Sequence, residues 1–393
     1  MKNTYRIIPT YTGDVSGIAS ALYEMGGLVV IHDPSGCNST YNTHDETRWY
    51  DEDSLIYISG LSEIDAILGN DDKFIRDVVH AADAFKPAFI ALVSSPVPYL
   101  NGTDFKGIAR LIEKRTGICT FFVQSNGTHD YSLGVGEAFL QLAKGLFEDR
   151  IPLKNAVAGP VPKDILPAAP AGSLKLNILG LTPLDYDEAG TRAGLYKKLS
   201  DFEILSLWAM DNSLKDLKKA PLADVNLVVS VTGLKLAGYM WEKFHIPYVW
   251  GAPVGDFTDV LKRRLQLAAE RQMPVESFEG PDPASEADGD PVYLIGEPLL
   301  MASLGEHIRI RYKKRAYVIN PLETDCSPAH IKTEGEEDLE KVLKNAACVV
   351  ADPLYKPILP AGVRFYPYSH EAFSGRCFRR ERVDLFADSL EAR

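Results

Sequence analysis

The residue with the clearest chemical potential is a cysteine in a turn rich in Pro and Gly. Cys37 stands in the stretch HDPSGCN, directly after an apolar run that is typical of a buried strand. A cysteine at the carboxyl end of a strand projects from the sheet edge, where its thiolate can be a nucleophile or a soft-metal ligand. Gly36 lets the backbone come close to whatever the sulfur binds. A buried, inert thiol is the usual state of a free cysteine, and that interpretation also stays open here.

Two further stretches follow predicted strands. In SSPVPYLNGTD, residues 94–104, a Gly, a Thr and an Asp precede a helical pattern. They suit either an anion or a simple helix cap, with Thr103 and Asp104 at the cap position. Later in the chain Cys326 and His330 are four residues apart, but a proline between them argues against a helix. Two ligands are too few for zinc, so we interpret this pair as structural.

Several catalytic patterns are missing from the sequence. It contains no G-x-x-x-x-G-K-[ST] phosphate loop, no G-x-G-x-x-G after the first strand of any predicted domain and no G-x-S-x-G elbow. The eight histidines show no metal-binding spacing. The chain therefore carries no ATP-hydrolysing or dinucleotide-binding motif of its own.

The composition of the chain limits which classes of partner and which cellular compartment are expected. The 393 residues include 42 Lys and Arg against 54 Asp and Glu, a formal net charge of −12. Nucleic acid and anionic membranes need a concentrated basic surface, so neither is expected as a partner. No apolar run reaches the length of about 18 residues that a membrane span requires. The N-terminus has no secretory signal pattern, and five scattered cysteines form no disulfide framework, so a cytoplasmic location is expected.

The elements that must position these residues alternate between strands and helices. Apolar runs rich in Val, Ile and Phe predict strands at 28–33, 55–59, 89–95 and 119–125, then at 175–181, 203–208 and 225–231, and finally at 292–296, 316–320 and 348–351. Helical periodicity predicts helices at 15–25, 71–85, 105–115, 133–147, 188–199, 214–219, 234–244, 299–306 and 336–345. Alternation of this length is typical of doubly wound parallel sheets.

Two breaks divide the pattern into three parts. A Pro-, Ala- and Gly-rich stretch at 158–173 and an acidic polar stretch at 277–291 have few core-forming residues. The expected architecture is α/β, with Rossmann-like open parallel-sheet domains at 1–172, 173–285 and 286–393. Ligands of such domains bind outside the carboxyl ends of the strands, so the residues just after each strand are the candidates.

The motifs together resemble a known family, nitrogenase component 1. This family includes the nitrogenase α and β subunits, the protochlorophyllide reductases and the nickel-sirohydrochlorin reductive cyclase. IHDPSGCNSTYNTHDETRW resembles the family's His-Gly-Pro-x-Gly-Cys segment, and GLSEIDAILGNDDKF and ALVSSPVPYLNGTDF follow in the family's order. FHIPYVWGAPVGDFTDVLKRRL resembles its Gly-Ile-Pro strand with the helix that follows. The resemblance implies three Rossmann-like domains around a central cleft, which agrees with the pattern of elements.

The resemblance also implies a metal centre. Cys37 matches the family's cluster-ligating cysteine, with Gly36 beside it, and Ser95 stands where the family has a second cluster cysteine before a proline. Residues 1–36 contain no cysteine to match the family's third. A [4Fe–4S] cluster takes four ligands, so one matched thiolate per chain implies a cluster at a subunit interface. The implied assembly is a homodimer, or a heterodimer with a related component 1 subunit.

By the same analogy, the chain is the reductase component that accepts electrons from a separate P-loop iron–sulfur ATPase and reduces an unknown substrate. Dinitrogen reduction on an iron–molybdenum cofactor is disfavoured. The family binds that cofactor through a Cys in the second domain, and residues 175–272 contain none. His370 lies in a segment that distantly resembles the family's His-containing one, but it is one residue out of position.

The sequence leaves two other hypotheses open. In one, the chain is a non-enzymatic scaffold on which a metallocofactor or tetrapyrrole is assembled. In the other, it is a cluster-free protein whose cleft holds a small ligand. Iron and acid-labile sulfide after anaerobic purification separate the cluster-free hypothesis from the others.

Overall fold

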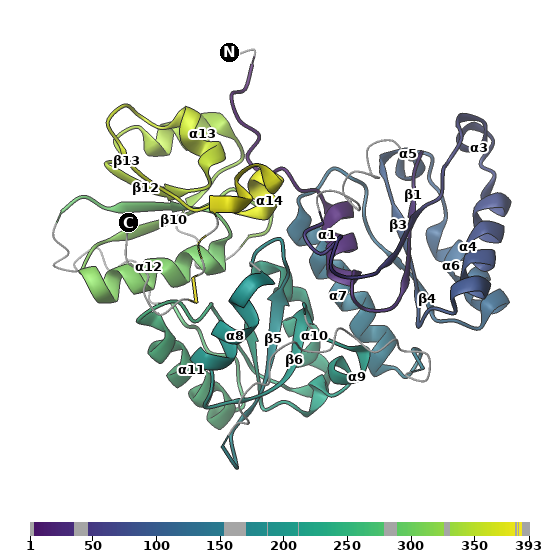
Figure 1. Cartoon of the computed structure of the whole chain (residues 1–393), viewed down its shortest axis with the longest axis horizontal. Coiled ribbons are helices and arrows are strands. Elements are labelled where there is room, and N and C mark those ends of the chain that lie inside the picture. Colours follow the sequence, from purple (N-terminus) through teal and green to yellow (C-terminus); the bar gives the residue numbers. More distant parts are fainter. Residues whose placement is uncertain are drawn as a thin grey trace. The chain divides into compact units, whose positions relative to one another are not determined.

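Three parallel β-sheets flanked by helices make up the chain in a computed structural model (Figure 1). The structure describes residues 4–34, 46–152, 170–186, 188–210, 212–278, 289–325, 331–381, 383 and 385–386. The predicted turn at Gly36 and Cys37, the Cys326–His330 pair and most of the two predicted breaks lie outside these residues. The α/β class with three open parallel sheets is confirmed.

The first sheet has the strand order β2-β1-β3-β4, and its neighbouring strands run parallel. Its strands are β1 (Leu28–His32), β2 (Leu55–Ile58), β3 (Ile90–Ser94) and β4 (Thr120–Val123). Its helices are α1 (Asp14–Leu22), α3 (Glu63–Leu68), α4 (Asp71–Phe85), α5 (Pro96–Leu100), α6 (Phe105–Thr116) and α7 (Tyr131–Phe147). β1 and β3 are buried along their whole length, as central strands covered on both faces must be.

Helices α4 and α6 cover one face of this sheet. Their buried apolar residues recur every three or four positions, for example Phe74 and Val78 in α4 and Ile108 and Ile112 in α6. They pack in one cluster with alternate residues of β1 and β3: Leu28, Val30, Ile90 and Leu92. Asp104 caps α6 by accepting the backbone N–H of Gly107 at 2.9 Å, which confirms the predicted cap.

Helices α1 and α7 pack side by side on the other face (Figure 1). Glycines on their facing sides allow the close approach. A Cβ on Gly134 of α7 would lie 2.1 Å from the backbone oxygen of Asp14, and one on Gly17 of α1 would lie 2.5 Å from that of Tyr131. No real side chain tolerates such a distance, so these two positions fix how close the helices come.

The second and third sheets repeat the plan with orders β6-β5-β7-β8 and β11-β10-β9-β12-β13. The second contains β5 (Lys175–Leu181), β6 (Glu203–Ala209), β7 (Val225–Val228) and β8 (Tyr248–Trp250), with α8 (Glu188–Lys198), α9 (Leu214–Leu217), α10 (Leu234–Phe244) and α11 (Phe257–Arg271). The third contains β9 (Val292–Ile295), β10 (Ala316–Asn320), β11 (Ile331–Lys332), β12 (Cys348–Ala351) and β13 (Arg364–Pro367), with α12 (Pro298–Tyr312), α13 (Glu336–Leu343) and α14 (Glu371–Ser374). Short 3₁₀ helices are η2 (Ala220–Leu222), η3 (Val231–Gly233), η4 (Pro353–Ile358) and η5 (Gly375–Glu381).

The chain divides into two compact units. The larger unit takes Met1–Thr12, Asp164–Leu205 and Pro221–Arg393, and the smaller takes Gly13–Lys163 and Ser206–Ala220. In the smaller unit Trp208 is fully buried, and its ring meets Phe139 and Phe147 of α7 edge-on at centroid distances of 5.8 and 6.4 Å. The domain boundaries at 172/173 and 285/286 remain predictions.

Sequence patterns missed several elements and misplaced several ends. Helices α3, α5 and α14 and strands β11 and β13 did not appear among the periodic segments, whereas β8 and α11 were expected through the resemblance alone. The helix predicted at 299–306 continues to Tyr312 in α12. Helices α3 and α5 have six and five residues, too few to show a helical period. The strand predicted at 225–231 ends at Val228, because residues Val231–Gly233 turn into η3. In the part of the chain that the structure describes, no helix is both long and apolar enough to span a bilayer.

We expect Gly134→Ala to destabilise the protein by about 1–3 kcal/mol, because its Cβ would overlap the α1 backbone. Gly238→Ala is the matched control, since Gly238 lies within α10 and its Cβ would meet nothing within 4 Å. Alanine's helix propensity should there raise the free energy of unfolding by up to about 1 kcal/mol. Urea unfolding of both variants checks the pair, and equal effects would contradict the close contact of α1 and α7.

Candidate functional site

The carboxyl ends of β1 and β3 mark the point in the first sheet where the chain begins to wind in the opposite direction. The chain leaves β1 toward β2 on one side, and the next strand, β3, lies on the other side of β1. Open α/β sheets bind ligands at such a point. His32 and Ser94 are partners in the register of these strands. The loops that carry the predicted site residues therefore begin side by side.

Ser95 ties the two loops together. Its side chain is fully buried, and its Oγ donates a hydrogen bond to the carbonyl oxygen of His32 at 2.9 Å. Although Ser95 occupies the N-cap position of α5, its hydroxyl does not cap that helix. The structure thus brings the predicted residue Ser95 next to the start of the turn that leads to Gly36 and Cys37, which themselves lie outside the described residues.

The turn after β4 packs against the start of α5. Gly127 has a φ of +75°, and a Cβ there would lie 2.6 Å from the ring of Pro96. Its backbone N–H donates to the carboxylate of Asp14 at 3.0 Å, as does that of Asn126. Ser95 and Pro96 are therefore held by a chain of contacts that reaches the first residue of α1.

His32 supports the turn as a neutral ring. Its imidazole stacks on Phe74 at a centroid distance of 4.1 Å, and its Nδ1 lies 2.8 Å from the Ser59 hydroxyl. Burial lowers the pKa of His32 to about 4, so the ring carries no charge at neutral pH. The Ser59 hydroxyl also accepts the backbone N–H of Asp33 at 3.1 Å, which fixes the first two residues after β1.

A cavity of about 490 Å³ opens beside this point. It is lined by His32, residues of α3 and of the loops before α4 and α6, and three carboxylates: Asp65, Asp71 and Asp104. Within the described residues, no group of three or more His, Cys, Asp or Glu side chains is placed to hold a metal ion. The described lining of the cavity is therefore acidic.

The described cysteines do not fit an iron–sulfur cluster, which takes thiolate ligands. Cys119 and Cys348 are buried at the starts of strands, and burial raises the pKa of Cys119 to about 11. Cys377 is exposed. A cluster at the ends of these strands would therefore depend on cysteines outside the described residues, Cys37 and Cys326, or on another chain.

A second group of buried acids lies in the larger unit, again just after strands. Asp185 follows β5, Glu297 follows β9 and Asp352 follows β12, and all three are at most 2% exposed. His370 follows β13, and its Nε2 lies 3.5 Å from Oδ1 of Asp185. The Asp352 carboxylate accepts the backbone N–H of His370 at 2.8 Å. Loops from the second and third sheets therefore meet here.

Glu297 is the best-placed proton carrier of this group. Its carboxyl accepts the backbone N–H of Val231 at 2.8 Å and that of Leu300 at 2.6 Å. Burial, together with the negative charge of Asp185, raises the pKa of Glu297 to about 8. A buried carboxyl that titrates near neutral pH can give or take a proton in general acid–base chemistry.

Sequence reasoning singled out only His370 from this group. Asp185, Glu297 and Asp352 were missed, although each stands within four residues of a strand's carboxyl end, the place where a ligand is expected. Each is also a single acid next to a proline or a leucine, and a single acid in an apolar stretch matches no catalytic or metal-binding motif. Applying the strand-end rule to all three sheets would have found them.

Open parallel sheets with polar residues in the loops after their strands define a broad class of α/β proteins, and a match to one family model identifies the family within that class. Residues 18–279 match the model of the nitrogenase component 1 type oxidoreductases, so the chain belongs to this family. The resemblance inferred from the motifs is thereby confirmed.

Individual relatives are distant. The nitrogenase molybdenum-iron protein alpha chain of Azospirillum brasilense is 24% identical over 250 residues, which cover 61% of this chain and 48% of the relative. The chain thus spans about half the length of this curated relative. A solved structure titled nitrogenase Cp1 at pH 6.5 has a TM-score of 0.62 at 15% identity and covers 94% of this chain and 87% of its own. The structure at pH 5 has a TM-score of 0.53 at 15% identity, with 87% and 72% covered.

The raised pKa of Glu297 predicts a pH dependence of stability. The folded protein keeps this proton up to about pH 8, whereas an ordinary Glu loses it near 4.5. The stabilising contribution is complete below pH 4.5 and is lost as the pH rises through 8. Glu297→Gln cannot titrate, so its free energy of unfolding should fall less between pH 5 and 8 than that of the wild type.

Denaturant unfolding across this pH range measures the difference. Glu337→Gln is the control, because Glu337 is an exposed residue of α13 in the same unit. It should follow the wild-type profile. Parallel profiles for Glu297→Gln and the wild type would contradict the assignment of a protonated carboxyl.

Proposed function

We propose that this chain is the substrate-reducing component of a nitrogenase-like reductase. It takes electrons from a separate P-loop iron–sulfur ATPase through an iron–sulfur cluster at a subunit interface, and it passes them to a substrate. The observation that carries the proposal is the hydrogen bond from Ser95 to the His32 carbonyl. It joins the two loops in which the family places cluster ligands, at the ligand-binding edge of the first sheet.

In this proposal Cys37 supplies the thiolate of this chain, and Gly36 allows the backbone to approach the cluster. Ser95 is a cofactor-site residue of a different kind: it holds the turn through the His32 carbonyl. A bound [4Fe–4S] cluster supplies one-electron transfer. The proposal includes a cytoplasmic location, because thiolate ligands persist where cysteines stay reduced.

An exposed apolar surface beside the site supports an interface between chains. We define the α3/α5 surface as Ile64, Ile67, Leu68, Tyr99 and Leu100, which are between 56% and 80% exposed. Asn101 at the end of α5 donates its side-chain amide to the carbonyl of Ala66 in α3 at 3.0 Å, so the two helices lie side by side. Contiguous exposed apolar residues of this kind mark interaction sites.

The partner on this surface is a second copy of the chain or a related component 1 subunit. One Cys37 cannot complete the four ligands of a [4Fe–4S] cluster, so the second chain would have to contribute the others. Glu297 and the acids beside it serve the uptake of protons, which accompanies the uptake of electrons when a substrate is reduced to a hydrogenated product. Glu297 is the proposed source of a proton.

We expect Cys37→Ala to lose iron, acid-labile sulfide and the broad absorption near roughly 400 nm that thiolate-ligated clusters show. Cys326→Ala tests the other cysteine outside the described residues and Cys377→Ala tests an exposed one, and both should keep all three signals. Each protein is purified under strict exclusion of oxygen, and circular dichroism checks the fold. A Cys37→Ala protein with its full iron content would overturn the cluster assignment.

The double variant Ile67→Asp/Leu100→Asp should be monomeric, because two charges on the α3/α5 surface would have to be buried without partners. Leu222→Asp is the matched control, since Leu222 is a 66% exposed leucine outside this surface. Light scattering under anaerobic conditions gives the mass of each protein. A wild type that holds a cluster yet is monomeric would speak against an interface site.

A further inference from the structure

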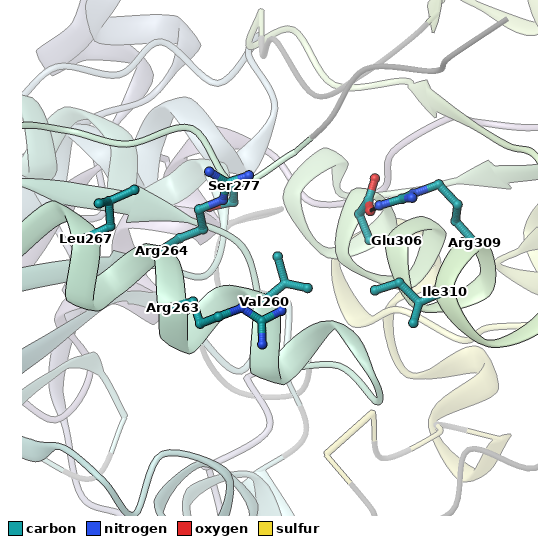
Figure 2. A pocket seen from close by; sticks show the side chains of 8 residues that line it. All are labelled: Val260, Arg263, Arg264, Leu267, Ser277, Glu306, Arg309 and Ile310. Atoms are coloured by element: carbon teal, nitrogen blue, oxygen red, sulfur yellow. Dashed lines mark hydrogen bonds and ion pairs between the residues drawn. The ribbon is translucent and has the colours of Figure 1, made fainter. Parts of the chain in front are cut away.

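A groove of about 400 Å³ lies between α11 and α12, within the larger unit (Figure 2). Four residues of α11 line one side, three residues of α12 line the other, and one residue after α11 completes the lining: Val260, Arg263, Arg264, Leu267, Glu306, Arg309, Ile310 and Ser277. Its volume falls in the range of small-molecule sites. The groove is separate from the residues of the proposed reductase function.

The lining follows from helical spacing. Val260, Arg263, Arg264 and Leu267 stand at i, i+3, i+4 and i+7, so they share one face of α11. The α12 residues, at positions 306, 309 and 310, share the face that meets it (Figure 2). The α11 wall therefore combines two guanidinium groups with two apolar side chains, and the α12 wall combines one guanidinium group with a carboxylate and one apolar side chain.

Positive charge exceeds negative charge in this lining. Among the described lining residues there are three arginines and one carboxylate, and Glu306 accepts from Arg309, whose Nε and Nη2 donate to Oε2 at 2.9 and 2.6 Å. The formal charge of these described residues is thus +2, in a chain whose formal net charge is −12. A guanidinium presents its donors in a planar fork that matches phosphate and carboxylate oxygens.

Ser277 gives an independent indication of a ligand. Its side chain is 2% exposed, and among the described residues its Oγ has no hydrogen-bond partner. Buried hydroxyls are normally satisfied, because burying one without a partner is unfavourable. A hydroxyl that lines an arginine-rich groove would be satisfied by an oxygen of a bound anion.

We propose that this groove binds a small organic phosphate. The phosphate lies between the guanidinium groups of Arg263 and Arg264 and accepts the hydroxyl of Ser277. The apolar part of the ligand packs on Val260, Leu267 and Ile310. This site does not depend on the cluster or on the reductase reaction, so either can fail without the other.

Calorimetric titration of the full chain with phenyl phosphate tests the proposal. We expect saturable binding at one site, about tenfold tighter than that of inorganic phosphate, because only the ester has an apolar part to bury. Phenol, which lacks the charge, should not bind. Equal affinities for phenol and phenyl phosphate, or no saturable binding of the ester, would overturn the proposal.

Variants locate the site. Arg263→Gln should weaken phenyl phosphate binding about tenfold, because it removes a charge-assisted hydrogen-bond donor. Ser277→Ala should weaken it severalfold. Arg271→Gln is the matched control, an exposed arginine of the same helix that does not line the groove. An effect of Arg271→Gln as large as that of Arg263→Gln, or unchanged affinity in Ser277→Ala, would overturn the site.

Discussion

Neighbouring strands of a parallel sheet end at the same edge, and in the first sheet one hydrogen bond joins the loops that begin there. The Ser95 hydroxyl reaches the last carbonyl of β1, so the turn after that strand and the start of α5 form one structure. Around it, Ser59 fixes the backbone of Asp33, and the turn at Gly127 closes on Pro96. Because a buried donor left without its acceptor is unfavourable, this pairing holds the edge in a single arrangement.

The strands of the larger unit also end at common edges, and there the loops after them bring ionisable side chains together. Four of its strands end in loops that bring carboxyl groups and one imidazole together, away from water. Glu297 accepts one N–H from the loop after β7 and one from the first turn of α12, so it connects the second sheet to the third. These bonds favour the ionised carboxyl, whereas burial and Asp185 favour the protonated one. Because these effects oppose each other and burial is the larger, the pKa of Glu297 lies at about 8.

Sequence periodicity was sufficient for elements that bury an apolar face. The prediction of 71–85 as a helix agrees with α4 at both ends, and that of 175–181 agrees with β5, because both have regular buried positions. It failed for α3, α5 and β11, which are short and expose much of their surface. The distant partners of Ser95 and Glu297 could not be predicted either. The hydrogen bonds from Ser95 to the His32 carbonyl and from the Val231 N–H to Glu297 each join residues more than 60 positions apart, which only the strand order brings together.

The burial of Trp208 against α7 has a consequence for how the protein is made. Phe139 and Phe147 belong to α7, but Trp208, whose ring covers them, is synthesised more than 60 residues later. The smaller unit closes only when Ser206–Ala220 has left the ribosome, after β5 and the start of β6 in the second sheet. Until then the nascent chain exposes an aromatic surface that chaperones recognise and that favours aggregation. A fragment that ends at residue 172 would keep that surface exposed permanently.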